Sequence, residues 1–159
     1  MPTLDDIYNF AKVSEQLGTA GQPQRDQFPA IKEAGYEVVI NLASGTTEQD
    51  IPEERDILAD LNLDYHHIPV DWENPTADDF KQFASLMDAN QDKQIFVHCI
   101  ANYRVSAFVM LYRVTQKDVP LADAKAFKET VWNPEHVFPI WETFITNTLR
   151  EHGIEDDNQ

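Results

Sequence analysis

The sequence contains one cysteine, five glycines and only 12 lysines and arginines against 28 aspartates and glutamates. One cysteine permits no internal disulfide, so the fold does not depend on an oxidising compartment. The formal net charge of -16 at pH 7 argues against nucleic acid or an anionic membrane as a partner, because such binding needs clustered basic side chains. A small anionic substrate stays compatible with this charge, since salt screens a distant field beyond about 10 Å.

Long apolar runs are also missing from the chain. No stretch is continuous enough to span a bilayer, and the first twenty residues lack the basic start and apolar core of a secretion signal. We therefore expect a soluble, cytoplasmic protein. A periplasmic protein whose signal peptide has been removed is the alternative.

The length sets the expected domain organisation. A chain of 159 residues, 42% of them hydrophobic, can bury one ordinary core, so we expect a single domain over residues 1–153. The polar end at residues 154–159 predicts a short, disordered acidic tail.

Three apolar, β-branched segments alternate with segments of helical periodicity. They predict strands over residues 36–42, 64–70 and 94–99, the first of them covered on both faces. Thr76 and Asp79 have the spacing of a capping box, which predicts the start of one of the intervening helices. The alternation predicts an α/β fold, with a mostly parallel sheet of about four to five strands, helices on both faces and a helical C-terminal part. The other expected helices cover residues 4–13, 52–62, 104 onward, 121–132 and 134–150, with a turn at 18–24.

The cysteine stands where the third predicted strand meets the next helix. Cys99 ends an apolar run, and Arg104 opens a helical pattern. In an open parallel sheet, ligands bind outside the carboxyl ends of the strands, where helix N-termini present free amides. Amides, helix terminus and guanidinium would hold an anion and favour the thiolate. Either residue alone is most often structural, but their combination at this junction favours an anion site.

The segment "HCIANYRVS" resembles the His-Cys-x5-Arg-Ser/Thr signature of cysteine-dependent protein tyrosine and dual-specificity phosphatases. Together with "GTAGQP", "YEVVINL" and "HHIPV" in that order, it resembles the small bacterial phosphatase-like proteins grouped as DUF442. The resemblance implies a cysteine-phosphatase fold. It also implies metal-independent hydrolysis of phosphomonoesters through a cysteinyl-phosphate, with no cofactor and a small phosphorylated substrate.

The resemblance also assigns roles to individual residues. Cys99 is the nucleophile, Arg104 holds the phosphoryl oxygens, and Asp71 protonates the leaving group, with Glu73 as the alternative acid. The other expected substrate-binding residues surround the cysteine: His98, which tunes the thiolate, Ile100, Ala101, Asn102, Tyr103 and Val105, which line the loop, and Ser106, whose hydroxyl stabilises the leaving thiolate. No metal is expected, because the adjacent His66 and His67 lack spaced ligand partners.

Departures from the phosphatase signature support two other interpretations. Four residues separate Cys99 from Arg104 instead of five, and Val105 displaces the hydroxyl residue by one position. Rhodanese-type sulfurtransferases use cysteine loops of the shorter length, so sulfur transfer through a Cys99 persulfide is the first alternative. A non-catalytic anion-binding module is the second. Asn102 stands nearest to the missing loop glycine, and asparagine is the ordinary residue best able to adopt a left-handed conformation.

Overall fold

The protein is described by a computed structural model that covers residues 2–134 and 137–156. Its centre is a five-stranded sheet in the order β1-β2-β5-β3-β4. All neighbouring strands are parallel except the pair β1 and β2. The predicted α/β fold with a mostly parallel sheet is confirmed. The strands are β1 (Ala11–Lys12), β2 (Leu17–Ala20), β3 (Val38–Asn41), β4 (Asp64–His67) and β5 (Ile95–His98).

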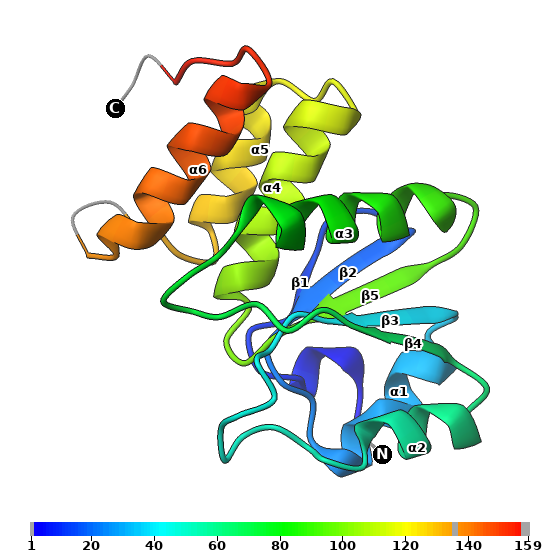
Figure 1. The fold of residues 1–159 in the computed structure, drawn as a ribbon. Coiled ribbons are helices and arrows are strands. Elements are labelled where there is room, and N and C mark those ends of the chain that lie inside the picture. Colours follow the sequence, from blue (N-terminus) through cyan, green and yellow to red (C-terminus); the bar gives the residue numbers. More distant parts are fainter. Residues whose placement is uncertain (1, 135–136, 157–159) are drawn as a thin grey trace.

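In the described part of the chain, α-helices cover both faces of this sheet (Figure 1). The first face carries two short helices, α1 (Phe28–Glu33) and α2 (Glu54–Asp60). The second face carries the longer ones, which are α3 (Ala77–Ala89), α4 (Tyr103–Gln116), α5 (Leu121–Glu129) and α6 (Pro139–Glu151). The capping box of α3 is present, since Thr76 Oγ1 accepts from the Asp79 N–H at 3.1 Å and Asp79 Oδ2 accepts from the Thr76 N–H at 3.2 Å.

The two faces of the sheet carry separate apolar clusters. On β3, Val38 and Ile40 belong to the cluster with α3 to α6, whereas Val39 belongs to the cluster with α1 and α2. On β5, Val97 and Phe96 divide in the same way. Strands buried on both faces need apolar side chains at every position, which explains the nearly continuous apolar runs of both segments.

The N-terminal segment corrects one prediction. The helix expected over residues 4–13 is a single 3₁₀ turn (Leu4–Asp6) followed by β1. Of the four apolar residues that suggested a helix, only Ile7 is buried, whereas Tyr8 is 62% exposed. Asn9 has a φ of 53°, which lies outside the right-handed helical region and ends any helix at this point.

The turn predicted over residues 18–24 is wrong in its first half, because β2 occupies Leu17–Ala20. This strand consists of small residues and has no apolar alternation that would indicate it. Its glycine is required by packing: a Cβ at Gly18 would lie 2.5 Å from Tyr36 Oη. The side chain of Tyr36 therefore lies directly against the strand.

The end of the chain is partly described. Ile154 packs against the core, and Asp156 pairs with Lys125 at 2.6 Å. Residues 157–159 of the predicted tail lie outside the described residues, as do residues 135–136 of the last predicted helix. The division into one domain and a tail stays a prediction. Within the described ranges, none of the helices combines the length and apolar character needed to cross a bilayer.

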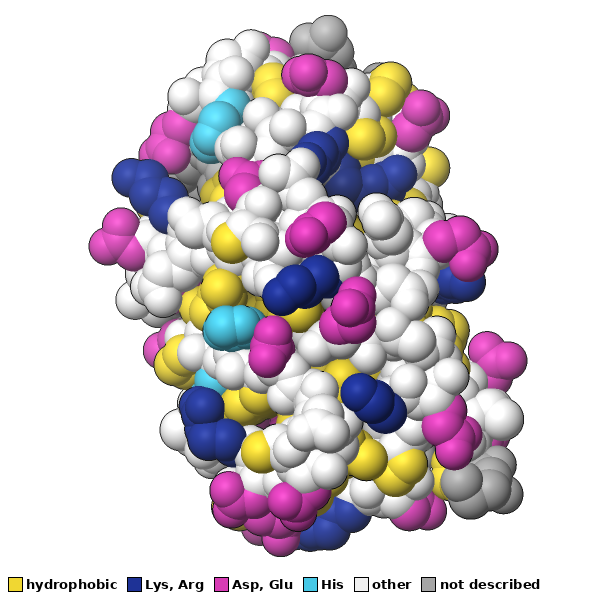
Figure 2. Space-filling view, turned by 90° about the vertical axis from the view of Figure 1, so that its right-hand side faces the viewer, with side chains coloured by type: hydrophobic (Ala, Val, Ile, Leu, Met, Phe, Trp, Pro, Cys, Tyr) yellow, Lys and Arg dark blue, Asp and Glu magenta, His cyan; other side chains and the backbone are white. Residues whose placement is uncertain are grey.

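The surface carries the negative charge in a dispersed form. Figure 2 shows acidic side chains spread over one face, with lysines and arginines interspersed among them. On that face the excess of acidic residues does not gather in a single patch. This dispersion fits an acidic surface that stays hydrated and soluble better than a dedicated binding site.

Candidate active site

Cys99 lies at the carboxyl end of the sheet, directly after β5, and α4 begins at Tyr103. The parallel strands on either side end at the same level, with Ala20 of β2 and Asn41 of β3 in register with His98. We call residues 99–104 the cradle loop. The structure therefore places the cysteine where the strand-loop-helix pattern predicted it, with α4 starting one residue earlier than expected.

Asn102 gives the cradle loop its sharp bend. It has a φ of 72° and a ψ of 4°, the left-handed conformation anticipated for it, and it is the N-cap of α4. Its side chain is fully buried and donates from Nδ2 to the backbone oxygen of Asn9 at 2.9 Å and to Thr19 Oγ1 at 3.1 Å. Its Oδ1 has no hydrogen-bond partner among the described residues. Asparagine thus replaces the phosphatase glycine and anchors the loop as well.

The sulfur and the guanidinium are both withdrawn from bulk solvent. Cys99 is 1% exposed and Arg104 is 6% exposed. Arg104 donates from Nη1 to the backbone oxygen of Val70 at 2.9 Å, and its guanidinium carbon lies 6.0 Å from the ring centroid of Trp72. The arginine therefore points inward, toward the loop that follows β4. The half-buried residues of the cradle loop, Ile100, Ala101 and Tyr103, form its accessible side.

The loop that follows β4 brings the two candidate acids close to this arginine along the chain. Asp71 directly follows Val70, whose carbonyl Arg104 binds. Asp71 and Glu73 are both exposed, and Asp71 Oδ1 accepts from the Glu73 N–H at 2.9 Å. Their exposure leaves both carboxyl groups accessible from solvent, and the distinction between them stays a prediction.

His98 lies behind the cysteine and faces hydrogen-bond acceptors with both ring nitrogens. Its Nδ1 lies 3.2 Å from the Cys99 carbonyl oxygen, and its Nε2 lies 2.6 Å from Glu54 Oε2. The other carboxylate oxygen of Glu54 accepts from Gln22 Nε2 at 3.0 Å. Carbonyl and carboxylate oxygens accept only, so this arrangement suits a ring that donates from both nitrogens.

The remaining predicted site residues lie in the first turn of α4. Ser106 is 1% exposed, and its Oγ donates to the Tyr103 carbonyl oxygen at 3.1 Å. Val105 is fully buried in the core. The hydroxyl is thus engaged within its own helix, and its predicted role toward the thiolate stays a prediction.

An aromatic cluster packs the Asp71 loop against the start of α4. Tyr103 stacks on Trp132 with ring centroids 4.8 Å apart and an interplanar angle of 6°. Trp72 lies between Trp132 and Trp141, at centroid distances of 5.5 Å and 5.2 Å, and its carbonyl accepts from Trp141 Nε1 at 2.8 Å. Trp132 and Trp141 are buried, as expected of core residues. The cluster fixes one wall of the site.

A cleft of about 800 Å³ borders the cradle loop on the side of β2. Ile100 and Ala101 contribute to its lining, together with Tyr8 and residues 22–26 and 48–51. Three carboxylates line it, whereas its one guanidinium, Arg25, is paired with Glu53 at 2.7 Å. The cleft is therefore net acidic.

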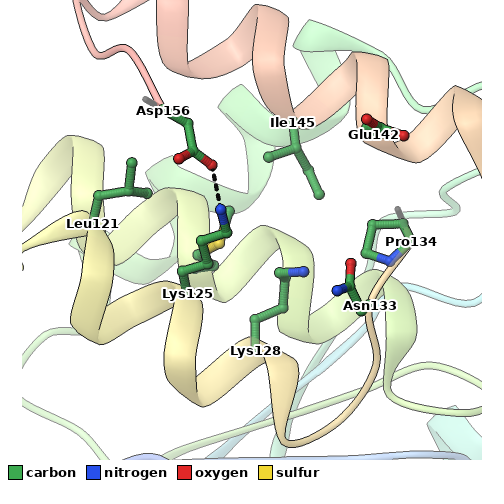
Figure 3. Close-up of a pocket in the computed structure, with 9 residues that line it drawn as sticks. Leu121, Lys125, Lys128, Asn133, Pro134, Glu142, Ile145 and Asp156 are labelled. Atoms are coloured by element: carbon green, nitrogen blue, oxygen red, sulfur yellow. Dashed lines mark hydrogen bonds and ion pairs between the residues drawn. The ribbon is translucent and has the colours of Figure 1, made fainter. Parts of the chain in front are cut away.

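A second pocket, between α5 and α6, contains Lys125 and Lys128 (Figure 3). The dashed line in the figure marks the ion pair between Lys125 and Asp156. Its lining includes no residue of the cradle loop. Among residues 2–134 and 137–156, no three His, Cys, Asp or Glu side chains converge as a metal site.

Several residues of the site were not found from the sequence. Glu54 lies 44 positions from His98 and Asn9 lies 93 positions from Asn102, so no local pattern relates them. Glu54 stands among other acidic residues that suit a helix N-terminus. The position of Trp72 beside Asp71 was the only signal that could have indicated its place in the site.

The fold and this site define the class of protein. The structure of P. aeruginosa TpbA in complex with pTyr matches with a TM-score of 0.69 and 11% sequence identity, over 86% of this chain and 82% of that one. At that identity the likeness concerns the fold alone. The fold is that of the cysteine phosphatases.

The chain belongs to the family described as "DSP-PTPase phosphatase fused to NAD+ Kinase", whose model matches residues 2–135. A candidate phosphatase of the DUF442 group from Shewanella putrefaciens CN-32 has 35% identity and a TM-score of 0.84, over 94% of this chain and 96% of that one. The resemblance to DUF442 is confirmed.

A curated relative, the "Beta-lactamase hydrolase-like protein" of Agrobacterium fabrum, is 26% identical over 122 residues. The match covers 75% of this chain and 28% of that protein. The chain thus spans little more than a quarter of the length of this relative.

Proposed function

We propose that the protein is a metal-independent phosphomonoesterase that acts through a cysteinyl-phosphate. The observation that carries the proposal is that Cys99 and Arg104, at the two ends of one short loop, are both withdrawn from solvent beside the N-terminus of α4. Backbone amides, a helix terminus and a guanidinium converge in this way on an anion. Membership of a phosphatase family supports the same chemistry.

The reaction begins with in-line attack by the Cys99 thiolate on phosphorus. The sulfur–phosphorus bond forms as the bond to the leaving oxygen breaks, and Asp71 gives its proton to that oxygen. Amides of residues 100–105 and the fork of Arg104 hold the nonbridging oxygens. Water then attacks the cysteinyl-phosphate, Asp71 takes the proton from it, and phosphate and the thiolate are released.

The buried residues behind the loop support the thiolate. His98, which donates toward the Cys99 carbonyl and toward Glu54, places a polar ring beside the nucleophile. A positively charged ring there would favour the ionised sulfur. Ser106, the hydroxyl nearest in sequence, would assist departure of the thiolate after it rotates away from the Tyr103 carbonyl.

The site chemistry favours small phosphorylated substrates. The relative TpbA was crystallised with pTyr, which supports an aryl phosphate as the first substrate to try. The net acidic cleft beside the cradle loop disfavours substrates with several further phosphates, because each added negative charge is repelled there.

Sulfur transfer is the second candidate, favoured by the four-residue spacing between Cys99 and Arg104. In that reaction the Cys99 thiolate attacks the outer sulfur of thiosulfate, a persulfide forms and sulfite leaves. Cyanide then takes the outer sulfur as thiocyanate and restores the thiolate. The same anion-holding loop would serve both reactions.

The test is hydrolysis of p-nitrophenyl phosphate by the wild-type protein and by Cys99→Ser. The proposal expects turnover in the wild type that vanadate inhibits and that the variant loses. Robust turnover by Cys99→Ser would refute it. Thiocyanate formation without phosphatase activity would favour the sulfurtransferase, and phosphate binding in calorimetry without either turnover would favour the anion-binding module.

A further inference from the structure

The N-terminal segment holds the cradle loop through a reciprocal pair of asparagine hydrogen bonds. Asn9 donates from Nδ2 to the backbone oxygen of Ala101 at 2.9 Å. Asn102 donates from Nδ2 to the backbone oxygen of Asn9, also at 2.9 Å. Each asparagine thus binds the backbone of the segment that carries the other, and both have positive φ, 53° and 72°.

Neighbouring contacts reinforce this pair. Thr19 Oγ1 accepts from Asn102 Nδ2 at 3.1 Å and donates to the Ala11 carbonyl oxygen at 2.6 Å. The Gln22 N–H donates to the Ile100 carbonyl oxygen at 2.9 Å, and the Gly21 N–H donates to the Tyr8 carbonyl oxygen at 2.8 Å. Residues 8–11, β2 and the cradle loop therefore form one hydrogen-bonded unit.

These bonds matter because of what an anion site requires of its backbone. A carbonyl oxygen turned toward a phosphoryl group would repel it. The carbonyls of Ile100 and Ala101 are instead occupied by donors from outside the loop, the Gln22 N–H and Asn9 Nδ2. Because C=O and N–H point in opposite directions across a trans peptide, fixing a carbonyl also fixes the amide that follows it.

We propose that Asn9 is a positioning residue for the anion site: its side chain holds the Ala101–Asn102 peptide in the orientation that keeps the carbonyl away from a bound oxyanion. Asn9 acts through the cradle loop and does not itself contact the substrate. The catalytic part of this inference rests on the proposed phosphatase function, whereas the conformational part does not.

The conformation of Asn9 determines which variants are informative. Alanine at a φ of 53° would add backbone strain to the loss of the side chain, so Asn9→Ala would mix two effects. Asn9→Gly accepts the same φ and removes only the donor. Asn9→Asp keeps the side-chain size and replaces the donor with an oxygen. Asn62→Gly is the matched control, because Asn62 has a φ of 59°, is exposed and follows α2 on the other side of the sheet.

The first measurement is amide hydrogen exchange of the peptide containing residues 99–106, followed by mass spectrometry. We expect faster exchange in Asn9→Gly and Asn9→Asp than in the wild type, and no change in Asn62→Gly. Urea unfolding of all three variants shows whether global stability accounts for the difference. Exchange in both Asn9 variants that equals that of the wild type would overturn the proposal, whatever the protein catalyses.

The second measurement tests the consequence for the anion site. Tungstate protection of Cys99 against alkylation reports binding, and p-nitrophenyl phosphate turnover reports kcat and KM. Loss of a hydrogen bond that orients the cradle is expected to weaken protection and lower kcat about tenfold, with KM changed less. Asn62→Gly should keep both values. A wild type that binds tungstate, with Asn9→Gly and Asn9→Asp equal to it, would overturn the positioning role. A wild type that neither binds nor turns over would contradict the proposed function and leave the exchange result to decide this inference.

Discussion

The Nε2 atom of His98 lies 2.6 Å from the Oε2 atom of Glu54, and the two side chains are 0% and 2% exposed. This pair joins α2, on one face of the sheet, to the residue that precedes the cysteine. Because burial leaves water unavailable to either group, each depends on the other for its hydrogen bond.

Removal of Glu54 is expected to destabilise the fold strongly. Glu54→Leu leaves the His98 ring and the Gln22 amide without their acceptor, and breaking a buried pair from one side costs about 3 kcal/mol or more. Glu54→Gln keeps one oxygen and should cost less. Urea unfolding measures both, with Glu53→Gln as the control, because Glu53 on the same turn is half-exposed and should change stability little. A Glu54→Leu protein as stable as the wild type would show that the pair is dispensable.

Replacement of Arg104 by lysine is expected to lower kcat about 10²- to 10³-fold, the usual loss for one donor to a developing oxyanion. Lysine cannot bind the Val70 carbonyl and two phosphoryl oxygens from one planar group. Steady-state kinetics with an aryl phosphate provide the measurement. Arg113→Lys is the matched control, since Arg113 lies on the same helix over the ring of Phe127. Equal effects at the two arginines would contradict the role given to Arg104.

Asp71→Asn is expected to lower kcat about 10²- to 10⁴-fold with alkyl phosphates, whose leaving groups need a proton. The loss should be much smaller with p-nitrophenyl phosphate, because nitrophenolate leaves without one. Glu73→Gln, two positions along the same exposed loop, should change neither rate. The reverse pattern, with the large loss in Glu73→Gln, would transfer the role to Glu73.

Stability should fall as the pH rises from about 10 to 12. Burial, reinforced by the nearby Glu54 carboxylate, raises the pKa of Tyr65 to about 12, whereas an unfolded tyrosine has a pKa of about 10. Within this window the folded state keeps a proton that the unfolded state has lost, so the stabilising contribution is complete below pH 10 and disappears above 12. Urea unfolding at several pH values should give a shallower decline for Tyr65→Phe. Tyr8→Phe, which removes a phenol that is 62% exposed, is the control; identical slopes in wild type and Tyr65→Phe would contradict the assignment.

The parts of this molecule that local sequence predicts are those in which neighbours along the chain determine the conformation. The apolar runs of β3 and β5, the capping box at Thr76 and the left-handed turn at Asn102 all follow from side chains within a few positions. The position of Cys99 at a strand end follows for the same reason.

Contacts between distant segments account for what the sequence did not predict. The pattern of Leu4, Ile7 and Ala11 resembles a helix, but Asn9 is drawn into a positive φ as its side chain and backbone bind the cradle loop. β2 is a strand because β1 and β5 pair with it on either side, although its residues carry little strand propensity. Long-range hydrogen bonding outweighed local preference in both places.

The most direct test of the central claim is the identity of the group that Cys99 carries during turnover. Asp71→Asn protein mixed with an aryl phosphate, quenched in acid and digested, is expected to yield the Cys99 peptide with one phosphoryl group on sulfur, because formation of the intermediate outlasts its slowed hydrolysis. Wild-type protein treated with thiosulfate should yield the same peptide without an added sulfur. Phosphate release with no adduct on Cys99, or a persulfide on Cys99 in place of the phosphoryl group, would contradict the phosphatase mechanism.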